Sequence, residues 1–126
     1  MTFRRIEEIE AWQRSMALAE NIYKVTTSTR FDKDWGLRDQ IRRAAVSIPS
    51  NIAEGFERNS EADFNRFILI YKGSCGELRT QLMLANRIEY ISKEEADILV
   101  RECIEISSML AGLSKFIVSG LQKARR

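Results

Sequence analysis

Few residues in this sequence have side chains suited to catalysis or metal binding. The chain has no histidine and two cysteines, which excludes Ser–His–Asp triads, zincin helices and the carboxylate–histidine pairs of di-iron bundles. Cys75 and Cys103 fall on the apolar stripes of two predicted helices, and two thiols without histidine make a poor zinc site. We interpret both as buried core residues. We therefore expect no metal and no cofactor, and predict that the protein is not an enzyme.

A glycine-containing segment also lacks the features of a phosphate-binding loop. Gly73-Ser74-Cys75-Gly76 lies in the middle of a predicted helix, where the backbone amides are already hydrogen-bonded. Neither a Walker loop nor a dinucleotide fingerprint is present in the sequence. Because an interior glycine costs about 1 kcal/mol relative to alanine, Gly73, Gly76 and Gly112 are predicted to allow close approach by a neighbouring helix.

Basic side chains are the remaining candidates for a binding function. The chain has 20 Lys and Arg against 18 Asp and Glu, a net charge of +2, which neither demands nor excludes a nucleic-acid partner. The candidate phosphate contacts are Arg38, Arg42, Arg58, Lys72, Arg79, Arg87, Lys115, Lys123, Arg125 and Arg126. The competing interpretation is a solvated face with carboxylates interspersed. Aromatic residues do not interleave with these positions, so we expect charge-driven binding without base stacking.

Helices must position all of these residues. Apolar residues recur at steps of three and four, and no segment shows the period-two alternation of a strand. The predicted helices span about 5–29, 35–54, 60–88 and 93–119. The links after the second and third helices are short, so these neighbours run antiparallel. We predict one all-α domain over residues 1–126, an antiparallel up-down-up-down four-helix bundle.

The apolar stripes and the helix ends make more detailed predictions. Ser60 and Ser92 are placed to cap the third and fourth helices, the latter with Glu95. Gly55 and Gly120 are placed as left-handed residues that close the second and fourth helices. The predicted core residues are, helix by helix, Ile9, Trp12, Met16, Ala19, Tyr23 and Thr26; Leu37, Ile41, Ala44 or Ala45, Ile48 and Ile52; Phe64, Phe67 or Ile68, Tyr71, Cys75, Leu78, Leu82 and Ala85; Ala96, Leu99, Cys103, Ile106, Leu110, Leu113 and Ile117.

The second predicted helix contains the single proline of the chain. Pro49 frees the carbonyl of Ala45 and should bend the helix, while Ser47, Ser50 and Asn51 lie near enough to satisfy the opened backbone. We favour a kinked helix over a binding site at this point, and assign Pro49, Asn51 and Gly55 structural roles.

Residues 40–55 read Gln-Ile-Arg-Arg-Ala-Ala-Val-Ser-Ile-Pro-Ser-Asn-Ile-Ala-Glu-Gly. Together with Trp12-Gln13, Gly73-Ser74 and Glu77-Leu78, this string closely resembles a bacterial four-helix bundle family, often labelled the 23S ribosomal RNA intervening-sequence protein. The resemblance runs from Ile6 to about Phe116. It implies a cytoplasmic homopentamer, and most members have no assigned activity. It also implies possible partners, because a related branch of retroelement accessory proteins pairs with a reverse transcriptase and binds nucleic acid.

The third predicted helix favours self-association on its own residues. Phe67 to Tyr71 are five consecutive apolar residues and point around the whole helix, whereas a monomeric bundle buries one stripe. Leu69, Ile70 and Val46 lie off the predicted stripes, as expected of an interface between copies. We predict a homo-oligomer.

A small and polar line on each of two helices extends this interface prediction. The lines are Gln40, Arg43, Ser47, Ser50 and Glu54 on the second helix and Ile70, Ser74, Glu77 and Gln81 on the third. Gly73, next to Ser74, is a further interface candidate. We hypothesise that the two lines meet, within the bundle or across subunits, with Arg43 and Glu77 as an ion pair. The alternative is that both lines face water.

The leading functional hypothesis is a non-enzymatic oligomer that binds RNA or DNA weakly, as an accessory or scaffold. The alternative is a protein-interaction oligomer whose charges serve solubility. The amino terminus lacks the apolar region of a signal peptide, and the longest apolar run is too short to cross a bilayer. We expect a cytoplasmic location and no membrane partner.

Overall fold

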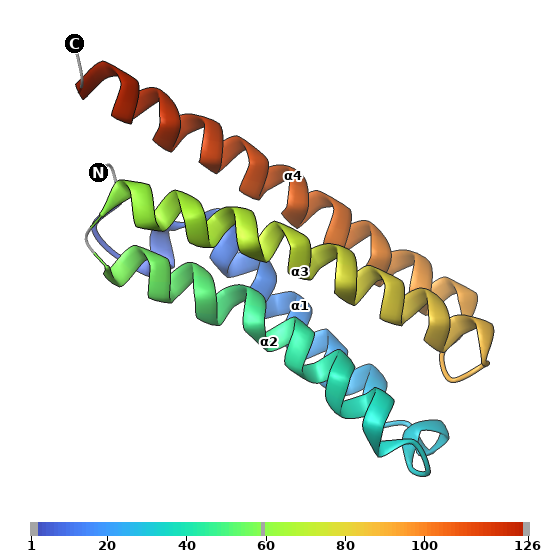
Figure 1. The fold of residues 1–126 in the computed structure, drawn as a ribbon. Helices are drawn as coiled ribbons and strands as arrows, with labels where there is room; N and C mark the ends of the chain where they lie inside the picture. The colour runs from blue at the N-terminus through green and yellow to red at the C-terminus, as the bar shows by residue number, and fades with distance from the viewer. Residues whose placement is uncertain (1–2, 59, 125–126) are drawn as a thin grey trace.

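Four long helices form the protein in the computed structural model, which describes residues 3–58 and 60–124, with side chains through Leu121. They are α1 (Glu10–Thr26), α2 (Trp35–Glu57), α3 (Glu61–Arg87) and α4 (Lys93–Ala124), with short 3₁₀ helices η1 (Ile6–Glu8) and η2 (Thr29–Phe31). Successive helices run antiparallel, so the two chain ends lie at one end of the bundle and the α1–α2 and α3–α4 links at the other (Figure 1). The predicted all-α bundle is confirmed.

The first predicted helix was too long at both ends. Ile9 has extended backbone angles (φ −83°, ψ 113°), which separate η1 from α1. At the other end Ser28 has non-helical backbone angles (φ −55°, ψ 142°), and its Oγ accepts a hydrogen bond from the Arg30 amide to begin η2. Serine and threonine hydroxyls compete with helical hydrogen bonds in this way, so Thr27-Ser28-Thr29 ends α1 early.

The predicted helix stops at Gly55 and Gly120 were wrong. Both glycines lie inside helices, and no described glycine has a positive φ. A Cβ added at Gly55 would lie 2.8 Å from the Cβ of Phe67, so Gly55 instead permits close approach of α2 to α3. Gly73, Gly76 and Gly112 do the opposite, because a Cβ on each would meet nothing within 4 Å. Their predicted close helix contacts are not made within the subunit.

The predicted serine caps are present. The Oγ of Ser60 accepts from the Asp63 amide at 3.2 Å. Ser92 and Glu95 form a reciprocal capping box, with bonds of 3.1 Å and 3.0 Å. A left-handed residue does close one helix, but it is Glu89 after α3, with φ 66°. The Tyr90 amide donates to the Ala85 carbonyl at 2.8 Å and the Glu89 amide to the Asn86 carbonyl at 3.0 Å, which is a Schellman motif.

Pro49 lies within a continuous α2, as predicted. Two polar side chains bond the backbone around it. Ser47 Oγ donates to the Ala44 carbonyl at 2.7 Å, and Asn51 Nδ2 donates to the Ser47 carbonyl at 2.6 Å. Among the described side chains, neither of these bonds reaches the Ala45 carbonyl that proline leaves without its usual helical donor, so the predicted direct repair of that carbonyl is not made.

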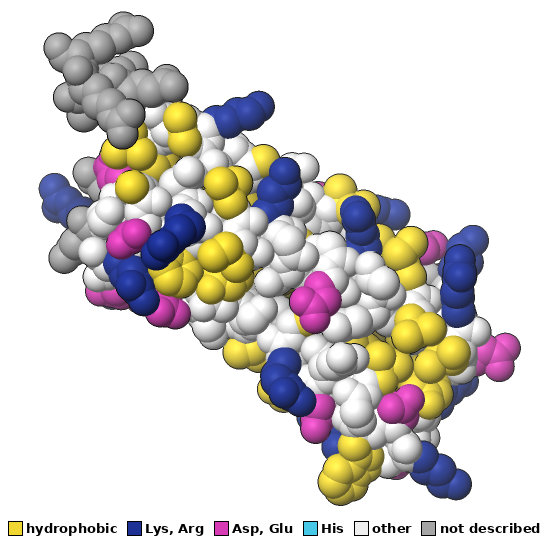
Figure 2. Space-filling view, viewed as in Figure 1, with side chains coloured by type: hydrophobic (Ala, Val, Ile, Leu, Met, Phe, Trp, Pro, Cys, Tyr) yellow, Lys and Arg dark blue, Asp and Glu magenta, His cyan; other side chains and the backbone are white. Residues whose placement is uncertain are grey.

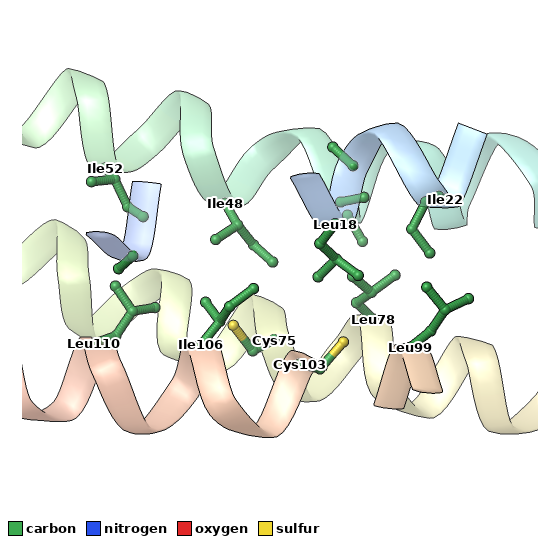
Figure 3. Packing of buried hydrophobic residues seen from close by; sticks show 14 of the residues in the cluster. Leu18, Ile22, Ile48, Ile52, Cys75, Leu78, Leu99, Cys103, Ile106 and Leu110 are labelled. Atoms are coloured by element: carbon green, nitrogen blue, oxygen red, sulfur yellow. The ribbon is translucent and has the colours of Figure 1, made fainter. Parts of the chain in front are cut away.

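The core confirms the predicted stripes of α2, α3 and α4, with Leu37 and Leu113 only partly buried, and confirms that of the first helix at Ile9, Ala19 and Thr26 alone. Leu18 and Ile22 point inward with Ile48, Leu78 and Ile106 (Figure 3). The predicted Met16 and Tyr23 are instead 39% and 45% exposed. α1 carries two apolar stripes on adjacent faces. The core uses Ala11, Ser15, Leu18 and Ile22, which leaves Trp12, Met16 and Tyr23 on the side toward the outer edge of α2.

Both cysteines are buried between α3 and α4, as predicted (Figure 3). Desolvation raises the pKa of the Cys75 thiol to about 11 and that of Cys103 to about 12, although Arg79 acts in the opposite direction on both. Both thiols are therefore protonated and unreactive near neutral pH.

The α4 segment Lys93–Leu121 meets a length-and-composition test for a membrane span, because an 18-residue window within it has a mean hydropathy of 1.3, and 22% of that window is buried. The sequence prediction, which considered only uninterrupted apolar runs, did not anticipate this. Core helices of bundles meet the same test, and Leu99, Cys103, Ile106 and Leu110 of α4 are buried against the other helices.

Candidate nucleic-acid interface

The α1–α2 and α3–α4 links are locked together at one end of the bundle. The Phe31 and Tyr90 rings pack edge to face with centroids 5.1 Å apart. The Tyr90 hydroxyl donates to Asp34 Oδ2 at 3.0 Å, and this bond raises the pKa of Tyr90. Arg30 Nη1 donates to the Glu89 carbonyl at 3.1 Å. The links thus form a fixed platform for the side chains that project from it.

Trp35 is the most exposed large hydrophobic residue at this end. It follows the N-cap Asp34, whose Oδ1 accepts from the Leu37 amide at 3.1 Å. The indole Nε1 donates to the Asp32 carbonyl at 2.6 Å, yet the side chain remains 66% exposed. The Arg38 guanidinium lies over the ring, 5.3 Å from its centroid. The ring is therefore both oriented and accessible.

A second arginine lies on a second exposed ring one turn further along α2. The Arg42 guanidinium carbon is 4.5 Å from the centroid of Tyr23 in α1. Arg42 Nε also donates to Thr26 Oγ1 at 2.8 Å. Arg38 and Arg42 thus each lie on an aromatic face, which offsets their mutual repulsion. The expectation that no aromatic residue accompanies these arginines was wrong; we call Tyr23, Trp35, Arg38 and Arg42 the arginine–aromatic strip.

Positive charge is concentrated around this strip. Residues 24–43 hold six basic and three acidic side chains. Of the acidic three, Asp34 is committed to capping α2 and to Tyr90. Asp39 Oδ1 lies 4.0 Å from Arg38 Nε, which is buried and makes no hydrogen bond. Within the described part of the chain, neither Arg42 nor Arg43 forms an ion pair.

A shallow hollow of about 270 Å³ adjoins the strip. Its lining combines an aromatic face, two guanidinium groups, one carboxylate and one aliphatic side chain. These residues are Tyr23, Asp39, Arg42, Arg43 and Val46.

The other predicted phosphate contacts do not join this cluster. Arg58 lies at the opposite end, 3.0 Å from Glu54 Oε1 and over the Phe67 ring. Lys72 and Arg79 flank a hollow of about 290 Å³ between α3 and α4. Arg87 is in the last turn of α3, and exposed Lys115 is in the second half of α4. The Lys123 side chain, Arg125 and Arg126 lie outside the described residues.

Basic side chains are accordingly spread along the whole length of the visible face, with apolar side chains between them (Figure 2). The ten predicted contacts therefore do not form one patch. Three of them, Arg38, Arg42 and Arg87, lie toward the end that carries the two links.

The predicted interface residues occupy two surfaces. Val46 lines an apolar groove of about 660 Å³ between α1 and α2, together with Trp12, Met16, Tyr23 and Pro49. Leu69 and Ile70 on α3 are 52% and 54% exposed. All three lie off the core stripes, as predicted, and each surface has the apolar character of a protein contact.

The polar lines of the interface prediction do not pair within the subunit. In the described ranges Arg43 and Glu77 form no ion pair, and Glu77 Oε1 accepts instead from Gln81 Nε2 at 3.3 Å. Gly73 has open space above it, and Ser47 and Ser74 are half-buried. Contact of these residues across subunits stays a prediction.

The described residues contain no group of three or more His, Cys, Asp or Glu side chains placed to hold a metal ion. Antiparallel packing of four helices, with no strand among the described residues, places the chain among helical-bundle proteins. The family model of the 23S rRNA-intervening sequence protein matches residues 7–112, and the chain belongs to this family. The resemblance predicted from residues 40–55 is confirmed.

A solved relative has the same fold. It is a protein with unknown function from the S23 ribosomal protein family of Bacteroides thetaiotaomicron VPI-5482. The two chains are 29% identical and superpose with a TM-score of 0.75, over 83% of this chain and 98% of the relative. No curated protein matches the chain.

Proposed function

We propose that the protein is a non-enzymatic oligomer that binds RNA or DNA weakly and with little sequence preference, as an accessory or scaffold. The observation that carries this proposal is the excess positive charge of residues 24–43, on the α1–α2 side of the end formed by the two links. Residues 24–43 have a net charge of +3, which exceeds the +2 of the whole chain. The remainder of the chain is close to neutral, and residues 87–97 around the α3–α4 link hold four acidic and two basic side chains, so a polyanion is attracted to the α1–α2 side of this end.

Repetition of this end in an oligomer strengthens the proposal. One subunit offers a handful of phosphate contacts, and such contacts are individually weak and salt-sensitive. Several copies held in one assembly would engage neighbouring phosphates of the same strand and raise the affinity without new chemistry. The exposed apolar surfaces at Val46 and at Leu69 and Ile70 supply the means of assembly.

Charge reversal at two exposed positions tests the proposal. Lys33 and Arg43 are both exposed, so Lys33→Glu with Arg43→Glu should leave the fold intact. We expect the double variant to weaken binding of a structured RNA strongly and to lower the slope of log affinity against log salt by about 2. Binding is measured by fluorescence anisotropy across a salt series.

The matched control is Arg4→Glu with Arg5→Glu, which changes the net charge equally at the opposite end of the bundle. Both control positions are exposed. Equal losses in the two double variants would show that bulk charge, rather than this end, attracts the RNA. Failure of the wild-type protein to bind at low salt would overturn the proposal.

The second candidate function is a protein-interaction oligomer with no nucleic-acid role. The apolar groove between α1 and α2, about 660 Å³ in volume, favours it, because such grooves accept apolar side chains of another protein. A reverse transcriptase or another protein would then be the partner. This candidate is favoured if the protein does not bind RNA and substitutions of Val46 change the mass of the assembly.

A further inference from the structure

We propose that the arginine–aromatic strip selects unpaired nucleotides, with bases stacked against Trp35 and Tyr23 and phosphates on the neighbouring cations. This inference rests on the proposed function and names the form of nucleic acid that the binding end prefers. A duplex hides the faces of its bases, whereas a single strand exposes them to aromatic rings and to guanidinium planes.

The orientation of Trp35 is the first step of the argument. An indole that is 66% exposed would ordinarily sample several rotamers. Here its Nε1 is bonded to the Asp32 carbonyl at 2.6 Å and Arg38 lies over the ring. A ring already held in place loses little conformational entropy when a base stacks on it. The exposed face of Trp35 is therefore already oriented for stacking. Its exposure does not result from exclusion of the side chain from the core.

The placement of charge around the rings is the second step. Arg38 and Arg42 are one helical turn apart, and Tyr23 lies under the latter at 4.5 Å. Exposed Arg43 borders the adjoining hollow of about 270 Å³, beside the ring of Tyr23. Rings and cations therefore alternate along the same edge of α1 and α2. Single-strand binding surfaces combine these two elements, a basic track and aromatic platforms.

The net positive charge favours a nucleic acid over a protein as the occupant. Tryptophan, tyrosine and arginine also dominate protein–protein hot spots. A protein partner would need carboxylates to match the basic side chains along residues 24–43, whereas a polynucleotide supplies both the negative charge and the flat rings in every residue. The protein alternative becomes one outcome of the test.

The experiment compares an oligothymidylate, which does not self-pair, with a duplex DNA carrying the same number of phosphates. The chain has two tryptophans, so Trp12→Phe leaves Trp35 as the only indole reporter. We expect the oligothymidylate to quench Trp35 fluorescence on binding and the duplex to leave it nearly unchanged. Trp35→Ala should weaken oligothymidylate binding about 5-fold or more, from the loss of one stacked base, and leave duplex binding within about 2-fold.

Trp35→Phe separates stacking from a merely structural role, because it keeps an aromatic face but lacks the indole N–H. It should recover part of the single-strand affinity that Trp35→Ala loses, because the aromatic face remains while the hydrogen bond that orients it does not. In addition, Trp35→Ala should leave the salt slope unchanged, since no phosphate contact is removed. Circular dichroism melting checks that both variants fold.

Equal affinity of wild type and Trp35→Ala for the oligothymidylate would overturn the inference. The proposed function would survive that result if Lys33→Glu with Arg43→Glu still weakened binding and lowered its salt dependence. A change in the mass of the assembly on Trp35→Ala, without any change in nucleic-acid affinity, would assign the ring to a protein contact and overturn the inference as well.

Discussion

Gly55 is crowded by a neighbouring helix, whereas Gly112 faces open space. Substitution by alanine should therefore change the free energy of unfolding in opposite directions at the two positions. At Gly55 the new Cβ would lie 2.8 Å from Phe67 Cβ, so Gly55→Ala forces α2 and α3 apart and should lower the free energy of unfolding by about 1–3 kcal/mol. At Gly112 nothing lies within 4 Å, so Gly112→Ala should raise it by about 1 kcal/mol. Urea unfolding followed by circular dichroism measures both, and a neutral Gly55→Ala would contradict the close helix approach.

The buried thiols predict how stability depends on pH. Burial raises the pKa of Cys75 to about 11 and that of Cys103 to about 12, above the ordinary value of 9.0. At about pH 8 and below, both thiols are almost fully protonated in the folded and unfolded chains. Above pH 9 the unfolded chain releases its protons first, so the free energy of unfolding falls as pH rises.

By about pH 10 this loss should reach roughly 1 kcal/mol per thiol. Guanidinium unfolding at about pH 8 and about pH 10 measures it in the wild type. Tyr71 titrates in the same direction, because burial also raises its pKa. Cys75→Ala with Cys103→Ala keeps the tyrosine contribution, and an identical pH dependence in that variant would exclude the thiols as the cause.

The structural roles of residues could be predicted from the sequence where they depend on a single helix. Buried Cys75 and Cys103 and the serine caps follow from spacing along a single helix. The arginine–aromatic strip was missed because Arg42 stacks on Tyr23 of another helix, and no spacing in the sequence records that contact. Trp35 and Arg38, three residues apart in one helix, were the signal that could have been used.

At the scale of elements, the turn from α3 to α4 makes its own prediction. Glu89 has φ 66°, a conformation that costs a residue with a Cβ about 1–2 kcal/mol. Glu89→Gly should therefore raise the free energy of unfolding by about 0.5–1 kcal/mol, since glycine also loses more entropy on folding. Thermal unfolding measures the gain. Glu94→Gly, at an exposed position within α4, is the control and should be destabilising.

The presence of each helix could be predicted more reliably than the face that the helix buries against the others. α2, α3 and α4 each have one dominant apolar stripe, and these stripes are buried as expected. α1 has two, and periodicity alone does not say which one meets the other helices. Packing chose Leu18 and Ile22 because they face the bundle axis, so Trp12, Met16 and Tyr23 were left to line the groove beside Val46.

At the scale of the whole molecule, self-association is the outstanding prediction. Light scattering should give the wild type a mass well above the 14.6 kDa of one chain. Val46→Glu and Leu69→Glu each place a charge in an exposed apolar surface, so each should shift the mass toward that of one chain. Asn21→Glu, at an exposed polar position of α1, is the matched control. A wild-type mass of one chain at micromolar concentration would contradict the prediction.

The bundle as a whole was predictable because its short links leave antiparallel packing as the simplest arrangement. The binding surface was not. Basic residues predicted as one set are divided by the fold between both ends and the middle, since a helix of 27 residues such as α3 carries its first and last side chains roughly 40 Å apart.

The antiparallel order also has a practical consequence for handling the protein. The start of α1 and the end of α4 lie at the end of the bundle away from the α1–α2 link (Figure 1), and Trp35 is the first residue of α2, directly after that link. A dye, affinity tag or surface tether placed near the start of α1 or the end of α4 would therefore be separated from the indole by about the length of a helix. Immobilised molecules would present the basic end outward, so kinetics recorded on a sensor chip should agree with those recorded free in solution.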